Sequence, residues 1–116
     1  MKRNPDFELF KKEFQKWQQR FGLIGYKVYF KYEPLDSSFA NIYVNQDEMV
    51  VTVTLNSKLP DKDKPFKDVK QSAKHEAIHL LVGKLDQNAR YRYVSEHEIH
   101  ESVEELVFKL EELIKE

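Results

Sequence analysis

The stretch His75–Val82, read HEAIHLLV, contains the pattern HExxH and is the most informative part of this chain. Residues four apart lie one turn apart on the same face of an α-helix, so His75 and His79 can both point at one ion. Neutral imidazoles are good zinc ligands, and Glu76 is free to hold and deprotonate a water molecule beside a metal. The pattern therefore predicts a helix that carries a zinc site.

The composition around the motif strengthens this interpretation. Apart from His75, Glu76 and His79, every residue of the stretch is apolar, and a helix that is apolar nearly all round is buried. Buried polar groups are costly unless they are paired or bind a metal. Shuffling this composition gives an HExxH in roughly one or two chains per hundred. The alternative is that these are core histidines whose hydrogen bonds are satisfied within the protein.

Length and charge limit the other classes of function. A chain of 116 residues has room for one core, so we expect a single domain spanning 1–116. Hydrophobic residues make up 41% and charged residues 34%, an ordinary globular balance. The formal net charge of −1 creates no strong field, so we expect neither a nucleic-acid partner nor binding to a membrane surface.

Cysteine usage and hydropathy indicate the compartment. The chain has no cysteine, which excludes disulfides, cysteine zinc sites and a thiol nucleophile and fits a reducing compartment. The N-terminus lacks the apolar run of a signal peptide. No stretch approaches the ~18 apolar residues of a transmembrane helix. We therefore expect a cytoplasmic protein.

An aromatic pattern predicts an N-terminal helix from about Asp6 to Phe21. Its aromatic residues recur at spacings of three and four, as on one helix face: Phe7, Phe10, Phe14, Trp17 and Phe21. Pro5 suits the first turn of this helix, and Gly22 suits its end. We interpret the aromatic stripe as core packing rather than as a ligand site.

Three strand-like runs follow, at Tyr26–Tyr32, Ala40–Val44 and Met49–Leu55. The short link at 45–48 predicts a hairpin between the second and third runs. Short connections favour an antiparallel meander. The predicted fold class is therefore α+β, with an N-terminal helix, a three-stranded antiparallel sheet, the HExxH helix and a C-terminal helix.

The segments around the motif are also predicted from composition. Residues 56–65 are polar and include two prolines, which indicates a loop. The motif helix is expected from about Phe66 to Val82, with Gly83 as its C-terminal cap. A loop or irregular segment is expected at 86–93.

The last helix is expected to supply the third zinc ligand. A catalytic zinc usually has three protein ligands and one open position, and no further histidine follows at the short HExxHxxGxxH spacing. Ser95 and Glu98 fit a capping box that opens a helix reaching about Ile114. This helix is rich in candidates: Glu96, His97, Glu98, His100, Glu101, Glu104 and Glu105.

Helical geometry ranks these candidates. One apolar stripe defines the face expected to pack inward: Ile99, Val103, Leu106, Val107, Leu110, Leu113 and Ile114. At about 100° per residue, Glu101 points away from the stripe, while Glu104 and His100 lie on one flank. A carboxylate completes the common His₂Glu set, so Glu104 is favoured. Glu101 stays open, with Glu105 as its supporting carboxylate one turn away, and His100 is the third candidate.

Four residues between the two site helices, Arg90–Tyr93, could face the open metal position. A tyrosine or arginine there could stabilise a developing oxyanion. Ion pairing and packing are the simpler interpretation for each of them. None is assigned a catalytic role.

The element order and three segments, SAKHEAIHLLVGKL, ARYRY and VEELVFKLEELI, resemble small zincin metallopeptidases encoded by tailed phages and prophages. The resemblance covers most of the chain. It implies a gluzincin-like site in which His75 and His79 bind zinc, Glu76 is the general base and a glutamate of the last helix is the third ligand. In zincins the strand nearest the metal helix pairs with an extended peptide. Here that strand would be Ala40–Val44 or Met49–Leu55.

The predicted function is that of a zinc-dependent hydrolase, a metallopeptidase that acts on a peptide or protein with Glu76 as general base. The alternative is a non-catalytic zincin scaffold, or a phage interaction module, in which the metal is structural. A closed shell with both His100 and Glu104 on the metal would favour that alternative. A nucleic-acid-associated protease of the SprT-like group is less favoured because the net charge is near zero.

Overall fold

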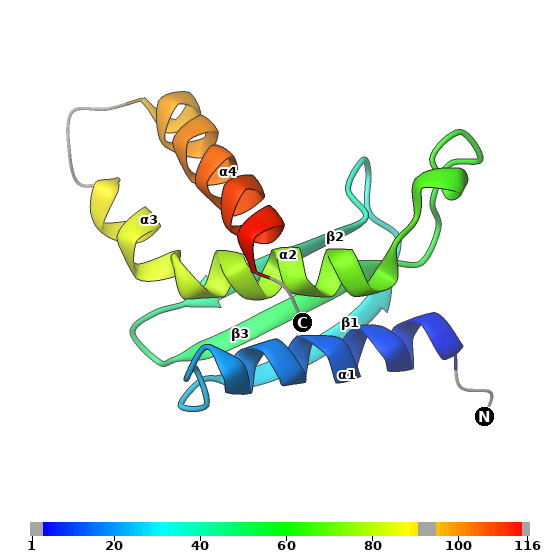
Figure 1. The fold of residues 1–116 in the computed structure, drawn as a ribbon, viewed down its shortest axis with the longest axis horizontal. Helices are drawn as coiled ribbons and strands as arrows, with labels where there is room; N and C mark the ends of the chain where they lie inside the picture. The colour runs from blue at the N-terminus through cyan, green and yellow to red at the C-terminus, as the bar shows by residue number, and fades with distance from the viewer. Residues whose placement is uncertain (1–3, 91–94, 115–116) are drawn as a thin grey trace.

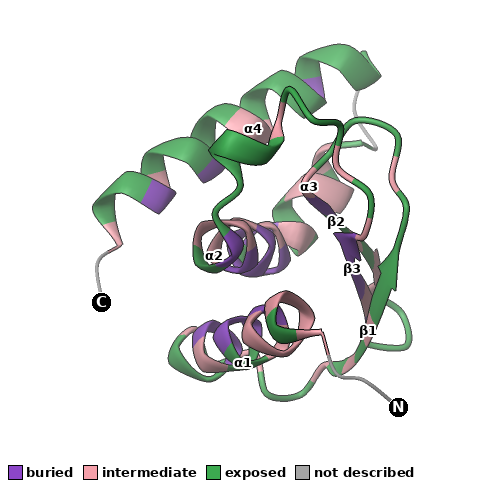
Figure 2. Cartoon of the chain, turned by 90° about the vertical axis from the view of Figure 1, so that its right-hand side faces the viewer, coloured by how far each residue is buried: buried purple, intermediate pink, exposed green. Residues whose placement is uncertain are grey.

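The computed structural model describes residues 4–90 and 95–114. Its helices and strands are shown in Figure 1: α1 (Pro5–Arg20), β1 (Lys27–Glu33), β2 (Ala40–Asn45), β3 (Val50–Asn56), the 3₁₀ helix η1 (Lys64–Phe66), α2 (Val69–Leu81), α3 (Gly83–Ala89) and α4 (Glu96–Leu113). The predicted α+β class is confirmed. Helices α1 and α2 lie side by side over one face of the sheet, and α4 packs against α2 and α3 on the side away from α1 (Figure 2).

The sheet is mixed, with the strand order β1-β3-β2. Strand β2 is antiparallel to β3 and pairs Ile42 with Val53, so the predicted hairpin is confirmed. Strand β1 is parallel to β3 and pairs Phe30 with Val53. The predicted all-antiparallel meander is therefore wrong, and β2 is an edge strand rather than the middle one.

The connection between β1 and β2 explains the difference. Residues 34–39 form no tight turn, and Pro34 at their start cannot donate a ladder hydrogen bond. Asn56, at the end of β3, holds this connection through its side chain, which accepts from the Leu35 N–H at 3.0 Å and donates to the Ser38 carbonyl at 2.8 Å. The link thus passes the end of β3, and β3 inserts between the two earlier strands.

The core lies between the sheet and the two helices that cover it. Phe30 of β1 packs edge-to-face on Phe10 and Phe14, at ring-centroid distances of 6.4 and 5.6 Å. The other buried apolar side chains of this core come from α1, from α2 and from strands β2 and β3 of the sheet: Trp17, Ala40, Val51, Val53, Leu55, Val69, Ala73, Ala77 and Leu80. The interpretation of the α1 aromatic stripe as core is confirmed.

Local signals set the ends of α1 as predicted. The Asn4 side chain accepts a hydrogen bond from the Phe7 N–H at 3.0 Å, and Pro5 occupies the first turn. Gly22 follows the helix with φ of 72°, a left-handed conformation that suits glycine.

Helix α2 begins later than predicted. Its N-cap is Asp68, whose side chain accepts a hydrogen bond from the Gln71 N–H at 3.1 Å. The preceding Lys64–Phe66 forms a separate 3₁₀ turn that contains Pro65. A start at Phe66 is therefore wrong, because the Asp68 cap satisfies the free N–H groups three residues further on.

The helical structure does not end at Gly83. Val82, with φ of −95° and ψ of 6°, ends α2 and is also the N-cap of α3, so Gly83 begins a helix instead of capping one. The loop predicted from residue 86 is helical as far as Ala89, and the rest of that predicted loop, 91–93, lies outside the described residues. Gly83 lies close to Gln46, because a Cβ there would lie 2.9 Å from Nε2 at the end of that flexible side chain.

Helix α4 matches its predicted start and end. Ser95 and Glu98 form the capping box, in which the Ser95 hydroxyl accepts from the Glu98 N–H at 3.1 Å. The inward face is narrower than the predicted stripe, because Leu106 and Leu113 are 37% and 75% exposed. Among the described elements, α2 and α3 are those that pack closely against α4, and they leave part of this wide stripe uncovered.

Within residues 4–90 and 95–114, none of the helices combines the length and the apolar composition needed to cross a membrane.

Candidate metal centre

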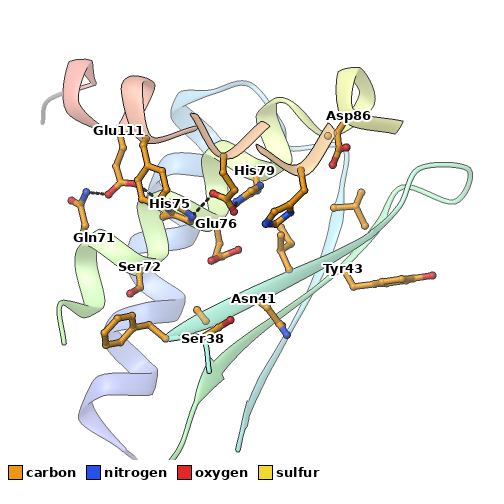
Figure 3. A pocket seen from close by; sticks show the side chains of 18 of the residues that line it. Ser38, Asn41, Tyr43, Gln71, Ser72, His75, Glu76, His79, Asp86 and Glu111 are labelled. Atoms are coloured by element: carbon orange, nitrogen blue, oxygen red, sulfur yellow. Dashed lines mark hydrogen bonds and ion pairs between the residues drawn. The ribbon is translucent and has the colours of Figure 1, made fainter. Parts of the chain in front are cut away.

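A cleft of about 790 Å³ separates β2 from α4 and is lined along its length by α2 and α3 (Figure 3). The edge strand β2 contributes a continuous run of lining residues, 40–44. Both motif histidines and Glu76 line the same cleft from α2. The mixed sheet order therefore matters for the site, because it places β2 rather than β3 beside it.

His75, His79 and Glu104 come together in this cleft. The three side chains offer ligand atoms that all lie within 4.8 Å of one another. Glu104 Oε1 lies 3.0 Å from His79 Nε2, and Glu104 Oε2 lies 3.5 Å from His75 Nε2. The one-turn spacing on α2 and the crossing of α4 over α2 produce this geometry. The structure thus places Glu104 where the helical angles predicted the third ligand.

These residues fit a divalent metal. Two imidazoles and a carboxylate make the His₂Glu set that is common in catalytic zinc sites. Glu104 Oε2 is buried and has no hydrogen-bond partner among the described residues. An unsatisfied buried carboxylate oxygen is costly, and a cation held by all three side chains would satisfy it.

Glu111 orients His75, although no sequence pattern singled it out. The His75 Nδ1–H donates to Glu111 Oε1 at 2.6 Å, which leaves the Nε2 lone pair of His75 for a metal. Glu111 is buried, with 8% of its surface exposed. It stands seven residues, or about two turns, after Glu104, so both project from the same side of α4. That spacing is the sequence signal that could have identified it.

The other predicted candidates on α4 lie away from the cluster. Glu101 forms an exposed ion pair with His97 at 2.5 Å, and Glu105 forms one with Lys109 at 2.8 Å. His100 lines the cleft but is exposed and is not one of the grouped ligands. Neither the paired arrangement of Glu101 with Glu105 nor a closed shell that includes His100 is present in the described part of the chain.

Glu76 is buried beside the cluster without being part of it. Only 6% of its surface is exposed, and its side chain points from α2 toward β2 (Figure 3). Burial, followed by the negative charges of Glu104 and Glu111, raises the pKa of Glu76 to about 8. A cation bound nearby would favour the charged form of this carboxyl.

His79 is held in the form that binds metals. Burial lowers the pKa of His79, and the neighbouring His75 lowers it further, while Glu104 and Asp86 act in the opposite direction. The net lowering favours the neutral imidazole, and a neutral imidazole is the form that ligates a metal.

Arg90, the described member of the predicted oxyanion candidates, is engaged elsewhere. Its guanidinium pairs with Asp86 at 3.1 Å and also with Glu96. It lines the far part of the cleft. The remaining candidates, Tyr91, Arg92 and Tyr93, lie outside the described residues.

No family model matches this chain, and no curated protein or solved structure matches it either. The residues of the cleft are therefore the basis from which we infer a function.

Proposed function

We propose that the protein is a zinc-dependent metallopeptidase that holds its metal through His75, His79 and Glu104. The observation that carries this proposal is the convergence of these three side chains within 4.8 Å in an open cleft, with a fourth ionisable group, Glu76, buried next to them. A zinc ion in such a site supplies a Lewis acid that polarises a substrate carbonyl and lowers the pKa of a water molecule.

Glu76 is the general base in this proposal. Glu76 is not one of the grouped ligand residues, but it lines the cleft between the metal helix and β2. Its carboxylate accepts a proton from the attacking water and passes it to the leaving amine. A purely structural metal site has no use for a buried carboxyl group at this place, which favours the enzyme over a non-catalytic scaffold.

The edge strand β2 suits an extended peptide substrate. The Asn56 N–H donates to the Phe39 carbonyl at 2.9 Å, which fixes the alternation of hydrogen bonds along this antiparallel pair. Backbone groups of Ala40, Ile42 and Val44 therefore face away from β3. A peptide added to this edge would form main-chain hydrogen bonds next to the metal helix, so β2 is the better candidate of the two strands left open by the sequence.

The proposal is tested by metal loading and peptide hydrolysis together. Protein stripped of metal and then given one equivalent of Zn²⁺ should bind it tightly and cleave members of a mixed peptide library, detected by mass spectrometry of new termini. Metal-free protein should be inactive, and re-addition of Zn²⁺ should restore cleavage. Tight zinc binding with no cleavage of any library member would favour the scaffold, and no zinc binding would reject the site itself.

A further inference from the structure

We propose that Lys74 is a positioning residue that fixes α4 on α2 and thereby sets the metal site without touching the metal ligands. This inference rests on the proposed function. Lys74 Nζ donates to the backbone carbonyl of Glu111 at 2.9 Å and to that of Ile114 at 3.2 Å. The carbonyls of a helix's last turn lack intrahelical partners, and that end of the helix carries partial negative charge. A cation from another helix therefore supplies hydrogen bonds to these carbonyls and offsets the negative charge at this end of α4.

The last turn of α4 contains no basic residue of its own. Its C-cap, Ile114, is extended rather than left-handed, with φ of −84° and ψ of 107°. Lys74 thus supplies from α2 a charge and two hydrogen bonds that the sequence of α4 does not provide.

Lys74 is itself held from the core side. Its Nζ lies 5.8 Å from the centre of the Trp17 ring, and Trp17 is buried on α1. A lysine over an aromatic face is favourably placed. The residue therefore links the core helix α1, through α2, to the end of α4.

A second side chain of α2 acts at the same end. Gln71, one turn before Lys74, donates through its amide to Glu111 Oε2 (Figure 3). Glu111 is thus held by Gln71 on one oxygen and by His75 on the other, while Lys74 holds its backbone. Side chain and main chain of this one residue are both fixed from α2.

The position of α4 depends on these contacts because few fully buried apolar side chains lie between it and α2. The cluster there has three buried members, Ile78 and Val82 from the α2 side and Val107 of α4, and four partly buried side chains pack against it: Phe21, Val103, Leu110 and Ile114. Glu104 and Glu111 both stand on α4, so any shift of this helix changes the distance from Glu104 to both imidazoles. Loss of Lys74 should therefore weaken metal binding, although Lys74 is not a ligand.

The test compares three lysine variants with the parent protein. Lys74→Met keeps an unbranched apolar stem but removes the ammonium group, and Lys74→Arg keeps a cation. Lys70→Met is the matched control because Lys70 is exposed on the same helix. Zn²⁺ affinity is measured by competition with a chelator. Amide hydrogen exchange across α4 is measured on the metal-free proteins.

Lys74→Met should weaken Zn²⁺ binding by about 10–100-fold, the range seen for groups that orient metal ligands. It should also speed amide exchange in the second half of α4. Lys74→Arg should restore most of both, and Lys70→Met should match the parent. Parental zinc affinity and parental exchange in Lys74→Met would overturn the proposal.

Two further arms keep the test decisive. If Lys74→Met does not fold, Lys74→Gln, which keeps a donor without the charge, takes its place, and parental affinity and exchange in that variant would overturn the proposal in the same way. Faster α4 exchange in metal-free Lys74→Met supports the positioning role even if the parent does not bind Zn²⁺. A parent protein that does not bind Zn²⁺ would reject only the proposed function. Failure of the function and failure of the positioning role are therefore distinguishable.

Discussion

Three carboxylates surround the two imidazoles of the cleft, and their surroundings separate their roles. Glu104 has a buried oxygen without a hydrogen-bond partner among the described residues, as the proposed metal ligand would. Glu111 is hydrogen-bonded to His75 and therefore orients it. Glu76 contacts neither imidazole in this way and is buried toward β2. The proposed ligand, orienting group and general base are thus three different glutamates.

The motif residues could be predicted from sequence because their spacing alone places them on one helix face. The angle of Glu104 on the last helix predicts a place beside the motif histidines, and Glu104 lies with them, although the stripe used to measure that angle includes Leu106 and Leu113, which are exposed. Its role as a ligand stays a prediction. Glu111 was missed because its role depends on where α4 crosses α2. That crossing brings one carboxylate to each side of the His75 ring; the seven-residue spacing from Glu104 places Glu111 on the same side of α4, but it does not show which helix α4 crosses.

Replacement of Glu76 by glutamine separates catalysis from metal binding. An amide can hydrogen-bond a water molecule but cannot accept its proton, so Glu76→Gln should keep stoichiometric zinc and lose hydrolysis by at least the ~10²–10⁴-fold typical of a general base. Metal content and peptide cleavage are measured on the same preparation. Glu105→Gln, at an exposed position, is the control. Undiminished turnover in Glu76→Gln would remove this residue from the mechanism.

Replacement of Glu111 by glutamine tests its orienting role. The amide can still meet the His75 Nδ1–H but offers no negative charge, so zinc affinity should fall by about 10–100-fold. The neighbouring Glu112, which is exposed, gives the matched control Glu112→Gln. Chelator competition measures both affinities. Equal affinities in the two variants would mean that Glu111 is dispensable to the site.

At the level of elements, local signals predicted most boundaries and long-range contacts decided the rest. Neighbouring residues predicted the first-turn Pro5 of α1, the capping box at Ser95 and the hairpin at 45–48, and each is present. The parallel pairing of β1 with β3 is not local, because it depends on the path of 34–39 around the end of β3. The same rearrangement gives β2 its free edge beside the cleft.

Proline in β2 tests whether that edge binds substrate. The Ile42 N–H faces away from β3, so Ile42→Pro removes a donor from the free edge without removing a hydrogen bond of the sheet. We expect folded, zinc-binding protein with kcat/KM for peptides lowered by about 10-fold, as expected for one lost hydrogen bond of roughly 1.4 kcal/mol. Circular dichroism checks the fold. Unchanged kcat/KM in folded Ile42→Pro would show that peptides bind elsewhere.

Across the whole molecule, the candidate site lies between α2, which packs in the main core, and α4, which packs in a smaller apolar cluster. Helices α1 and α2 share the main core with the sheet, whereas α4 joins the smaller cluster, in which its Val107 packs with Ile78 and Val82. A metal held by α2 and α4 together would bind only when α4 is docked. Metal binding should therefore stabilise the folded protein as a whole.

This linkage predicts a measurable gain in stability. Free Zn²⁺ at 100 times its Kd should raise the free energy of unfolding by about 2.7 kcal/mol, provided that the unfolded chain does not bind it. Urea unfolding followed by Trp17 emission, with and without Zn²⁺, measures the change. His79→Ala should show little or none of it. A comparable gain in His79→Ala would place the zinc somewhere else.

The most direct test of the account is a crystal structure of the protein with zinc bound. The account predicts one zinc ion with Nε2 of His75, Nε2 of His79 and a carboxylate oxygen of Glu104 as its protein ligands, each at about 2.0–2.2 Å, and Glu111 still on His75 Nδ1. A metal held instead by Glu101 or His100, or a fourth protein ligand that closes the site, would contradict it.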